Sequence, residues 1–187
     1  MSGRIVDIEV ANDGLTFYVA AASGGIWKTE DNGQSFNPIF DHQGALGIGA
    51  MALSKSDNNI LWVGTGEDNS SRSTYAGNGI HKSTDGGKTW EHIGLIHSQH
   101  IGQILIHPTN PDILLAASWE RYRQAHDFIG NGKGSAIWRS EDGGNTWKKA
   151  VEPVTLQWSQ AAQKAGANPN DVLNDLKREL AARKAAY

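Results

Sequence analysis

The chain has 187 residues, of which 39% are hydrophobic and 20% charged, a composition typical of a folded globular protein. Its formal net charge of −3 at pH 7 offers no basic surface of the kind that binds phosphate backbones, which excludes nucleic acid as an expected partner. The sequence has no cysteine, so disulfides, thiolate metal sites and a cysteine nucleophile are excluded as well.

The first residues do not have the pattern of a targeting segment. MSGRIVDIEV lacks a basic stretch followed by an apolar one, and no part of the chain approaches the roughly 18 consecutive apolar residues of a membrane span. We therefore expect no membrane span, and a cytoplasmic location for the chain as written.

Short apolar or alternating runs, typical of β-strands, occur along the chain in three sets of four. Turn-forming residues separate the first two runs of each set, as in Asn12-Asp13-Gly14. Four antiparallel strands per repeat predict an all-β chain of three propeller blades, at about residues 4–40, 48–93 and 101–151. The expected strands are 5–10, 16–21, 25–29 and 35–40; then 48–53, 60–64, 79–83 and 89–93; then 101–107, 113–117, 136–140 and 146–151.

One motif recurs between the third and fourth runs of every set. Segments beginning at Ile26, Ile80 and Ile137 align without a gap and share the pattern Ser/Thr-x-Asp-x-Gly-x-Ser/Thr-aromatic. In a tight turn the carboxylate can accept backbone hydrogen bonds, the glycine supplies a positive φ, and the aromatic ring can pack beneath the turn. The pattern predicts a structural rather than a catalytic role for Asp31, Gly33, Asp85, Gly87, Trp90, Asp142, Gly144 and Trp147.

This motif resembles the Asp-box, or bacterial neuraminidase repeat (BNR), of sialidases, sortilin and related β-propellers. Residues 2–147 are similar to the N-terminal blades of bacterial sortilin-like or sialidase-like propeller proteins that are described loosely as glycosyl hydrolases. The pieces that carry this likeness are residues 3–8, 21–29, 64–73 and 79–90. The resemblance implies a secreted or periplasmic, carbohydrate-related parent protein.

The resemblance does not carry over any catalytic residue. Sialidases open with a Phe-Arg-Ile-Pro motif, of which only Arg4-Ile5 remains here. Xyloglucanase-like enzymes place their catalytic carboxylates between two complete propellers, and three blades cannot close even one ring, because propellers use about four to eight. We expect either a fragment of a larger propeller, the favoured interpretation, or copies that assemble with one another.

The last part of the chain, residues 152–187, departs from the strand pattern. Asn170 is a plausible N-cap, and the apolar residues Val172, Leu173, Leu176 and Leu180 form a narrow stripe. This spacing predicts a C-terminal amphipathic helix of about four turns. The helix is interpreted as a cap over an exposed blade edge, in preference to a helix that binds a partner.

Two long loops are the expected location of a ligand site. Residues 65–78 and 118–134 connect the second and third strands of their blades, where the first blade needs only residues 22–25. In an up-and-down blade these loops share one face with the links between blades, opposite the Asp-box turns, and long loops on such a scaffold are often functional. The predicted ligand-binding residues are Glu67, Asp68, Arg72, Tyr75, Trp119, Arg121 and Arg123.

Carboxylates, arginines and aromatic rings together suit a sugar or an acidic ligand. The first hypothesis is a binding scaffold for a carbohydrate or a protein. The alternative is a fragment of a sialidase-like or xyloglucanase-like glycoside hydrolase, with Glu67, Asp68 and Glu120 as weak catalytic candidates. Whether the chain is an enzyme stays open, with the non-catalytic interpretation preferred. No cofactor or metal is expected, because the spacing of His97 and His100 suits a helix whereas the segment leads into a strand.

Overall fold

A computed structural model describes residues 3–69, 75–150 and 159–166, together with residues 168, 171, 174, 175 and 178. The chain divides into two compact units, Met1–Lys149 and Ala150–Tyr187, which are considered separately. Within the described residues, no helix is long and apolar enough to cross a membrane.

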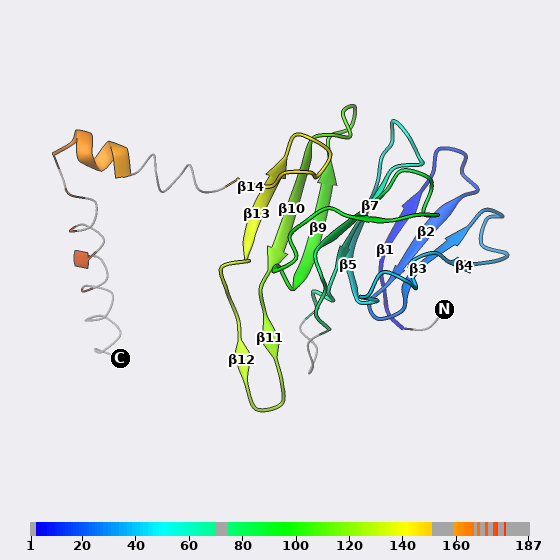
Figure 1. Cartoon of the computed structure of the whole chain (residues 1–187), viewed down its shortest axis with the longest axis horizontal. Helices are drawn as coiled ribbons and strands as arrows, with labels where there is room; N and C mark the ends of the chain where they lie inside the picture. Colours follow the sequence, from blue (N-terminus) through cyan, green and yellow to red (C-terminus); the bar gives the residue numbers. More distant parts are fainter. Residues whose placement is uncertain are drawn as a thin grey trace. The chain divides into compact units, whose positions relative to one another are not determined.

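The first unit consists of three four-stranded antiparallel sheets that follow one another along the chain (Figure 1), as predicted. We call them blades one, two and three, and in each the strands lie side by side in sequence order. Blade one contains β1 (Ile5–Val10), β2 (Phe17–Ala21), β3 (Gly25–Thr29) and β4 (Asn37–Pro38). Blade two contains β5 (Ile48–Leu53), β6 (Leu61–Thr65), β7 (Ile80–Ser83) and β8 (Glu91–His92). Blade three contains β9 (His100–Ile106), β10 (Leu114–Trp119), β13 (Ala136–Ser140) and β14 (Lys148–Lys149).

A small hairpin that the sequence did not predict interrupts blade three. Strands β11 (Tyr122–Arg123) and β12 (Phe128–Ile129) pair with each other inside the long loop between β10 and β13. The hairpin extends beyond the end of the sheet in Figure 1. Part of the expected loop is therefore an ordered two-stranded extension.

The second unit contains one short described helix, at residues 159–164. Residues 171, 174, 175 and 178 are also helical, and Arg178 forms an ion pair of 2.9 Å with Asp175. The proposed N-cap Asn170 and the whole predicted apolar stripe lie outside the described residues. The predicted amphipathic helix thus stays a prediction, and the helix at 159–164 lies before its expected start.

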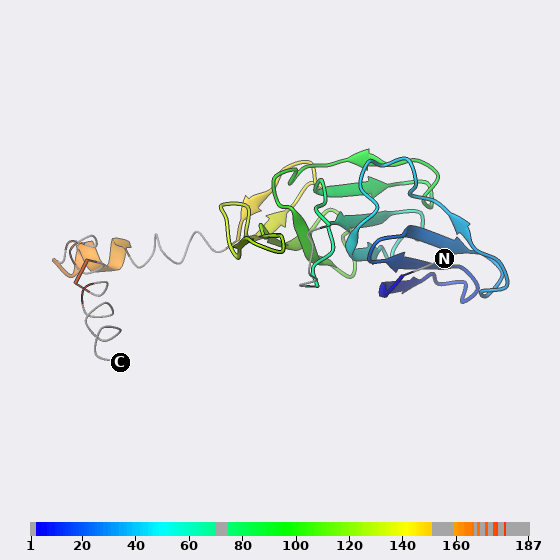
Figure 2. The same cartoon turned by 90° about the horizontal axis from the view of Figure 1, so that it is seen from below.

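The blades pack face to face in chain order, with β1 against β5 and β5 against β9 (Figure 2). One buried cluster lies between blades one and two and includes Tyr18, Ile26 and Met51, and a second lies between blades two and three and includes Trp62 and Ile80. Every residue of β5 and β6 is buried, because the middle blade is covered on both faces. The core of this unit is therefore divided between two blade interfaces.

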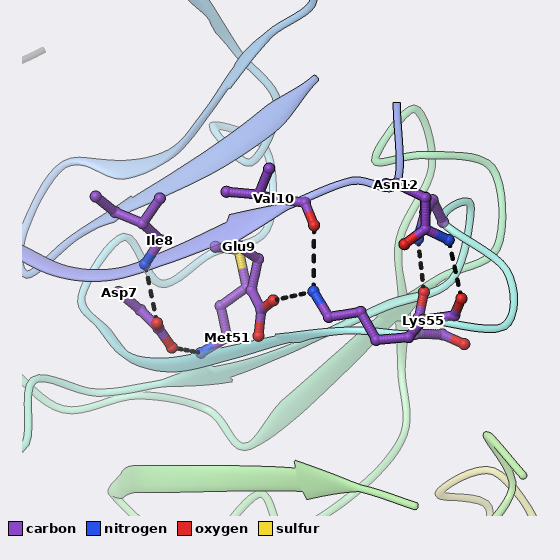
Figure 3. Close-up of polar contacts among 9 residues, drawn as sticks. Asp7, Ile8, Glu9, Val10, Asn12, Met51 and Lys55 are labelled. Carbon is purple, nitrogen blue, oxygen red and sulfur yellow. Dashed lines mark hydrogen bonds and ion pairs between the residues drawn. The ribbon is translucent and has the colours of Figure 1, made fainter. Parts of the chain in front are cut away.

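Polar contacts also join the inner strands of blades one and two (Figure 3). The carboxylate of Asp7 accepts a hydrogen bond of 2.9 Å from the backbone N–H of Met51. Lys55 forms an ion pair of 3.1 Å with Glu9, and Asn12 donates to the carbonyl of Lys55 at 3.0 Å. These contacts fix the position of one blade along the other.

The three repeated turns share one hydrogen-bond network. In blade two, Asp85 accepts hydrogen bonds from the hydroxyl of Ser83 at 2.8 Å, from the backbone N–H of Thr89 at 2.9 Å and from the hydroxyl of Thr89 at 2.6 Å. Ser83 in turn accepts from the N–H of Gly87, whose φ is +87°. Asp31 and Asp142 make the corresponding contacts. Hydrogen bonds within each turn thus provide partners for the aspartate carboxylate and for the hydroxyl of the preceding serine or threonine.

The aromatic residue after each turn reaches the preceding blade rather than only its own turn. Trp90 donates its indole N–H to the carbonyl of Ile39 in blade one at 2.8 Å. Trp147 donates in the same way to Ile93 in blade two at 3.0 Å. Phe36, at the matching position of blade one, has no such donor and packs edge-on against Phe17. Each tryptophan therefore forms a hydrogen bond that links its blade to the preceding blade.

We expect the repeated turns to make stability depend on pH in acid. Hydrogen bonds from the following hydroxyl residue, with those from the preceding one, lower the pKa of Asp31, Asp85 and Asp142 from 3.8 to about 2. A lowered folded-state pKa gives stability that is complete above the unfolded value and is lost as pH falls toward the folded one. The urea midpoint should fall between about pH 4 and about pH 2, and Asp142→Asn should reduce this fall.

Asp127→Asn is the matched control, because the carboxylate of Asp127 accepts no hydrogen bond from the described part of the chain. It should leave both the midpoint at neutral pH and its acid dependence unchanged. An Asp142→Asn protein that loses as much stability in acid as the wild type would contradict the explanation.

We expect Trp90→Phe to lower the free energy of unfolding by about 1 kcal/mol, the usual net value of one hydrogen bond. The change removes the donor to Ile39 and part of the ring system that packs edge-on against Phe40 at 5.0 Å, so the loss should be at least this large. Urea denaturation measures the loss. Unchanged stability would show that the contact between Trp90 and Ile39 contributes nothing net.

Candidate functional site

A cleft of about 560 Å³ opens where blades two and three meet. Its walls come from the link between the two blades and from the two ends of the long loop that contains the β11–β12 hairpin. Links and second-to-third loops share one end of the blades, and the repeated turns lie at the other. We call this site the loop-face cleft, and it is lined by Leu95, Ile96, His97, Ser98, Glu120, Lys133, Gly134 and Trp138.

A compact turn holds the link side of the cleft in place. Ser98 donates both its N–H, at 3.0 Å, and its hydroxyl, at 2.6 Å, to the carbonyl of Leu95. Leu95 and Gln99 have φ values of +54° and +61°, a conformation that side chains other than glycine seldom adopt. The turn leaves Ile96 57% exposed beside the cleft.

The opposite wall is built by Trp138 and Glu120. Trp138, in β13, donates its indole N–H to the hydroxyl of Ser118 at 2.7 Å, and the ammonium group of Lys149 lies 5.4 Å from its ring centroid. Glu120 accepts a hydrogen bond of 2.6 Å from the N–H of Gly134, and its own N–H donates to Ser135. Hydrogen bonds therefore set the positions of the indole and of one carboxylate at the cleft.

A buried polar cluster joins the two long loops at the same end of the blades. Glu67 is 4% exposed and forms an ion pair with Arg4, which precedes β1. Arg121 is fully buried and donates to the carbonyls of Glu67 at 3.3 Å and Asn69 at 3.5 Å. Within the described residues, the Nε and Nη1 atoms of Arg121 have no hydrogen-bond partner. The hydrogen bonds of the buried Arg121 therefore connect the two loops.

His100 and Asp68 complete the surroundings of this cluster. His100 is the first residue of β9 and is fully buried, with Nε2 at 3.1 Å from the carbonyl of Arg121. Burial lowers the pKa of His100 and also that of Arg121, while burial raises the pKa of Asp68. Because burial favours the uncharged forms, the imidazole of His100 is neutral near pH 7.

The remaining predicted residues lie around these two features. Trp119 donates to the carbonyl of Gly130 at 2.6 Å, and its ring lies 4.8 Å from the guanidinium carbon of Arg121. The side chain of Arg123 lies over the ring of Phe128 in the hairpin, with 5.9 Å to the centroid. Tyr75 is 50% exposed, and its carbonyl accepts the N–H of Glu67. Arg72 lies outside the described residues.

Four of the predicted residues thus fall into two groups. Glu67, Asp68 and Arg121 lie together in the buried cluster, whereas Glu120 lines the cleft. Sequence reasoning missed several lining residues of the cleft: Leu95, Ile96, Lys133 and Trp138. The apolar pair Leu95-Ile96 in a link was the one available signal, because a tryptophan inside a strand is normally structural.

We expect Glu67→Gln to destabilise the protein by about 2 kcal/mol or more, because it removes the buried partner of Arg4 and a negative charge beside Arg121. Glu141→Gln is the matched control. Glu141 also pairs with an arginine, Arg139, at 2.8 Å, but these side chains are 64% and 53% exposed. The control should change stability by about 0.5 kcal/mol or less, and equal losses in urea denaturation would contradict the assigned role of Glu67.

Solved structures share the fold of this chain at low sequence identity. An ancestral GH74 enzyme matches with a TM-score of 0.60 and 22% identity over 78% of the chain. The GH74 xyloglucanase from Xanthomonas campestris matches with a TM-score of 0.53 and 21% identity over 79%. YCF48 bound to D1 peptide matches with a TM-score of 0.50 and 18% identity over 79%. The chain spans only 18%, 20% and 39% of these proteins.

No curated protein matches the sequence. A family model does match it, over residues 24–185, and this model is described as "Sortilin, neurotensin receptor 3". The matched stretch begins within blade one and includes blades two and three. Because it covers most of the 187 residues, the chain belongs to the Sortilin-Vps10 family.

Proposed function

We propose that this propeller scaffold binds a peptide segment of another protein in the loop-face cleft, without catalysing a reaction on it. The observation that carries the proposal is the cleft itself, because its volume of about 560 Å³ lies within the range of about 300–1,000 Å³ for ligand sites. The cleft opens at the end of the blades where the long loops gather.

The lining of the cleft favours an apolar anchor with polar groups around it. Leu95, Ile96 and Trp138 supply apolar contact, while Glu120 and Lys133 supply one charge of each sign. Such a site buries one large side chain of a ligand and fixes its orientation through a few polar contacts. A peptide has both kinds of group within a few residues.

The comparisons support a peptide in preference to a sugar. The description of the matching family names a neurotensin receptor, and one structural neighbour is bound to D1 peptide. In addition, the ammonium group of Lys149 lies over the ring of Trp138, which leaves less of the indole face for stacking on a sugar ring.

A glycoside hydrolase fragment is the second candidate, and the two GH74 neighbours favour it. Glycosidases need two carboxyl groups on either side of the scissile bond. Glu120 is the one acidic residue among the described residues that line the cleft, whereas Glu67 is buried beside Arg4. The arrangement of these carboxylates supports binding better than hydrolysis.

The wider context of the chain is also part of the proposal. The resemblance to sortilin-like and sialidase-like proteins supports an exported protein. The small share of each neighbour that the chain spans supports an assembly with further blades, supplied by other chain segments or by further copies.

We expect a phage library of random peptides to yield binders that depend on the loop-face cleft. Ile96→Asp should weaken such a peptide about tenfold or more, because it places a charge against the apolar anchor. Leu15→Asp is the matched control, since Leu15 is exposed to a similar extent, 54% against 57%, and does not line the cleft. Isothermal titration calorimetry measures both affinities.

Xyloglucan oligosaccharides serve as the competing ligands in the same titration. The peptide proposal fails if no peptide is enriched, or if the enriched peptides bind the Ile96→Asp protein unchanged. Cleavage of xyloglucan by the wild type that Glu120→Gln abolishes would establish the hydrolase interpretation instead.

A further inference from the structure

Each inner blade interface joins two different faces. We call the face of a blade that packs on the following blade its front, and the face that packs on the preceding blade its back. Tyr18 of blade one and Trp62 of blade two are front residues, whereas Met51 of blade two and Ile104 of blade three are back residues. The chain therefore contains two interfaces of the same front-to-back kind.

The strand registers show which residues correspond between blades. Cross-strand partners in the first two strands are Glu9 with Tyr18, Ala52 with Trp62, and Leu105 with Leu115. The next pair along the same face is Ala20 with Ile26, Gly64 with Ile80, and Ala117 with Ile137. Positions in the three blades can thus be matched one to one.

The front of blade three is apolar and is not covered by another blade of the chain. Leu105, Leu115 and Ile137 are 55%, 39% and 46% exposed, whereas Trp62 and Ile80, at the positions of Leu115 and Ile137 in blade two, are fully buried. The front residues of blade three are apolar, as interface residues are. In blade two the corresponding residues are covered by the next sheet, whereas in blade three no further sheet covers them. Exposed contiguous apolar residues of this kind mark interaction surfaces.

The back of blade one is apolar and uncovered in the same way. Ile8 and Val10 are 55% and 47% exposed. Their counterparts in blade two, Met51 and Leu53, are 1% and 3% exposed, because blade one covers them. The chain thus carries one free front and one free back.

We propose that two copies of this chain join front to back, blade three of each copy packing on blade one of the other, to form a closed ring of six blades. The free front and the free back are the two halves of an interface that the chain already forms twice internally. A ring of six is within the range of about four to eight blades for propellers. Twofold symmetry makes the two new interfaces identical, so that neither free face remains.

The new interface lacks one contact that both internal ones have. Trp90 and Trp147 donate a hydrogen bond to the preceding blade, but Phe36 of blade one has no donor to offer. The interface between copies is therefore weaker than those within a copy, and the ring dissociates on dilution.

Light scattering after size exclusion tests the proposal on the whole chain, from about 1 µM to about 100 µM. The wild type should approach 40.4 kDa, twice the 20.2 kDa of one chain, as its concentration rises. Leu115→Glu and Ile8→Glu should each stay at 20.2 kDa, because each places a charge in one half of the interface. Leu46→Glu is the matched control and should still dimerise, since Leu46 lies in the link between blades one and two and is 42% exposed.

Cross-linking separates a loss of contact from a loss of folding. The chain has no cysteine, so Leu115→Cys and Ile8→Cys chains each carry a single thiol. A short thiol cross-linker should join a mixture of the two and neither chain alone. A wild type that stays at 20.2 kDa throughout, assembles beyond two copies, or cross-links equally within either variant alone overturns the proposal. A monomer in which the thiol of Leu115→Cys is shielded from a soluble maleimide would also overturn the proposal, and would assign that face to the chain's own C-terminal unit.

Discussion

A four-stranded sheet in this chain has two apolar faces, and a sheet of so few strands is stable only when neighbouring sheets cover them. Blade two shows the requirement fully met, with all of β5 and β6 buried. The features at the loop end follow from this packing. The link between blades two and three must cross from an outer strand to an inner one, and the long loop of blade three lies beside it. The loop-face cleft occupies the space between them.

The sequence predicted the sheets well because two independent signals coincided, strand-like alternation and a motif repeated in one register. The predicted inner strands agree with the structure within about one or two residues, as for 48–53 and β5. The outermost strands are much shorter than predicted, for example Asn37–Pro38 instead of 35–40. An outermost strand pairs on one side only, and Pro38 has no backbone N–H to donate, so little holds a longer ladder together.

The candidate site was less predictable, because a residue's type does not reveal which side of a loop is covered. Two charged loops were expected to meet, and Arg121 does contact the backbone of Glu67. Nothing in the sequence indicated that Arg121 is fully buried, since arginine is usually exposed. The sequence did not predict the cleft, because the apolar residues that line it have the pattern of ordinary structural positions. Trp138 lies in a regular strand and Leu95 in a short link, and only the packing of two blades brings them together.

The indole hydrogen bonds give the row of blades a direction. Each one runs from a blade to the carbonyl of the blade before it, from Trp90 to Ile39 and from Trp147 to Ile93. During synthesis from the N-terminus, every acceptor therefore precedes its tryptophan, and Phe36 in blade one has no indole N–H to donate. Removing blade three would leave the carbonyl of Ile93 without the indole N–H of Trp147, and removing blade one would leave the indole N–H of Trp90 without the carbonyl of Ile39. Loss of a blade thus frees an acceptor at one end of the row and a donor at the other.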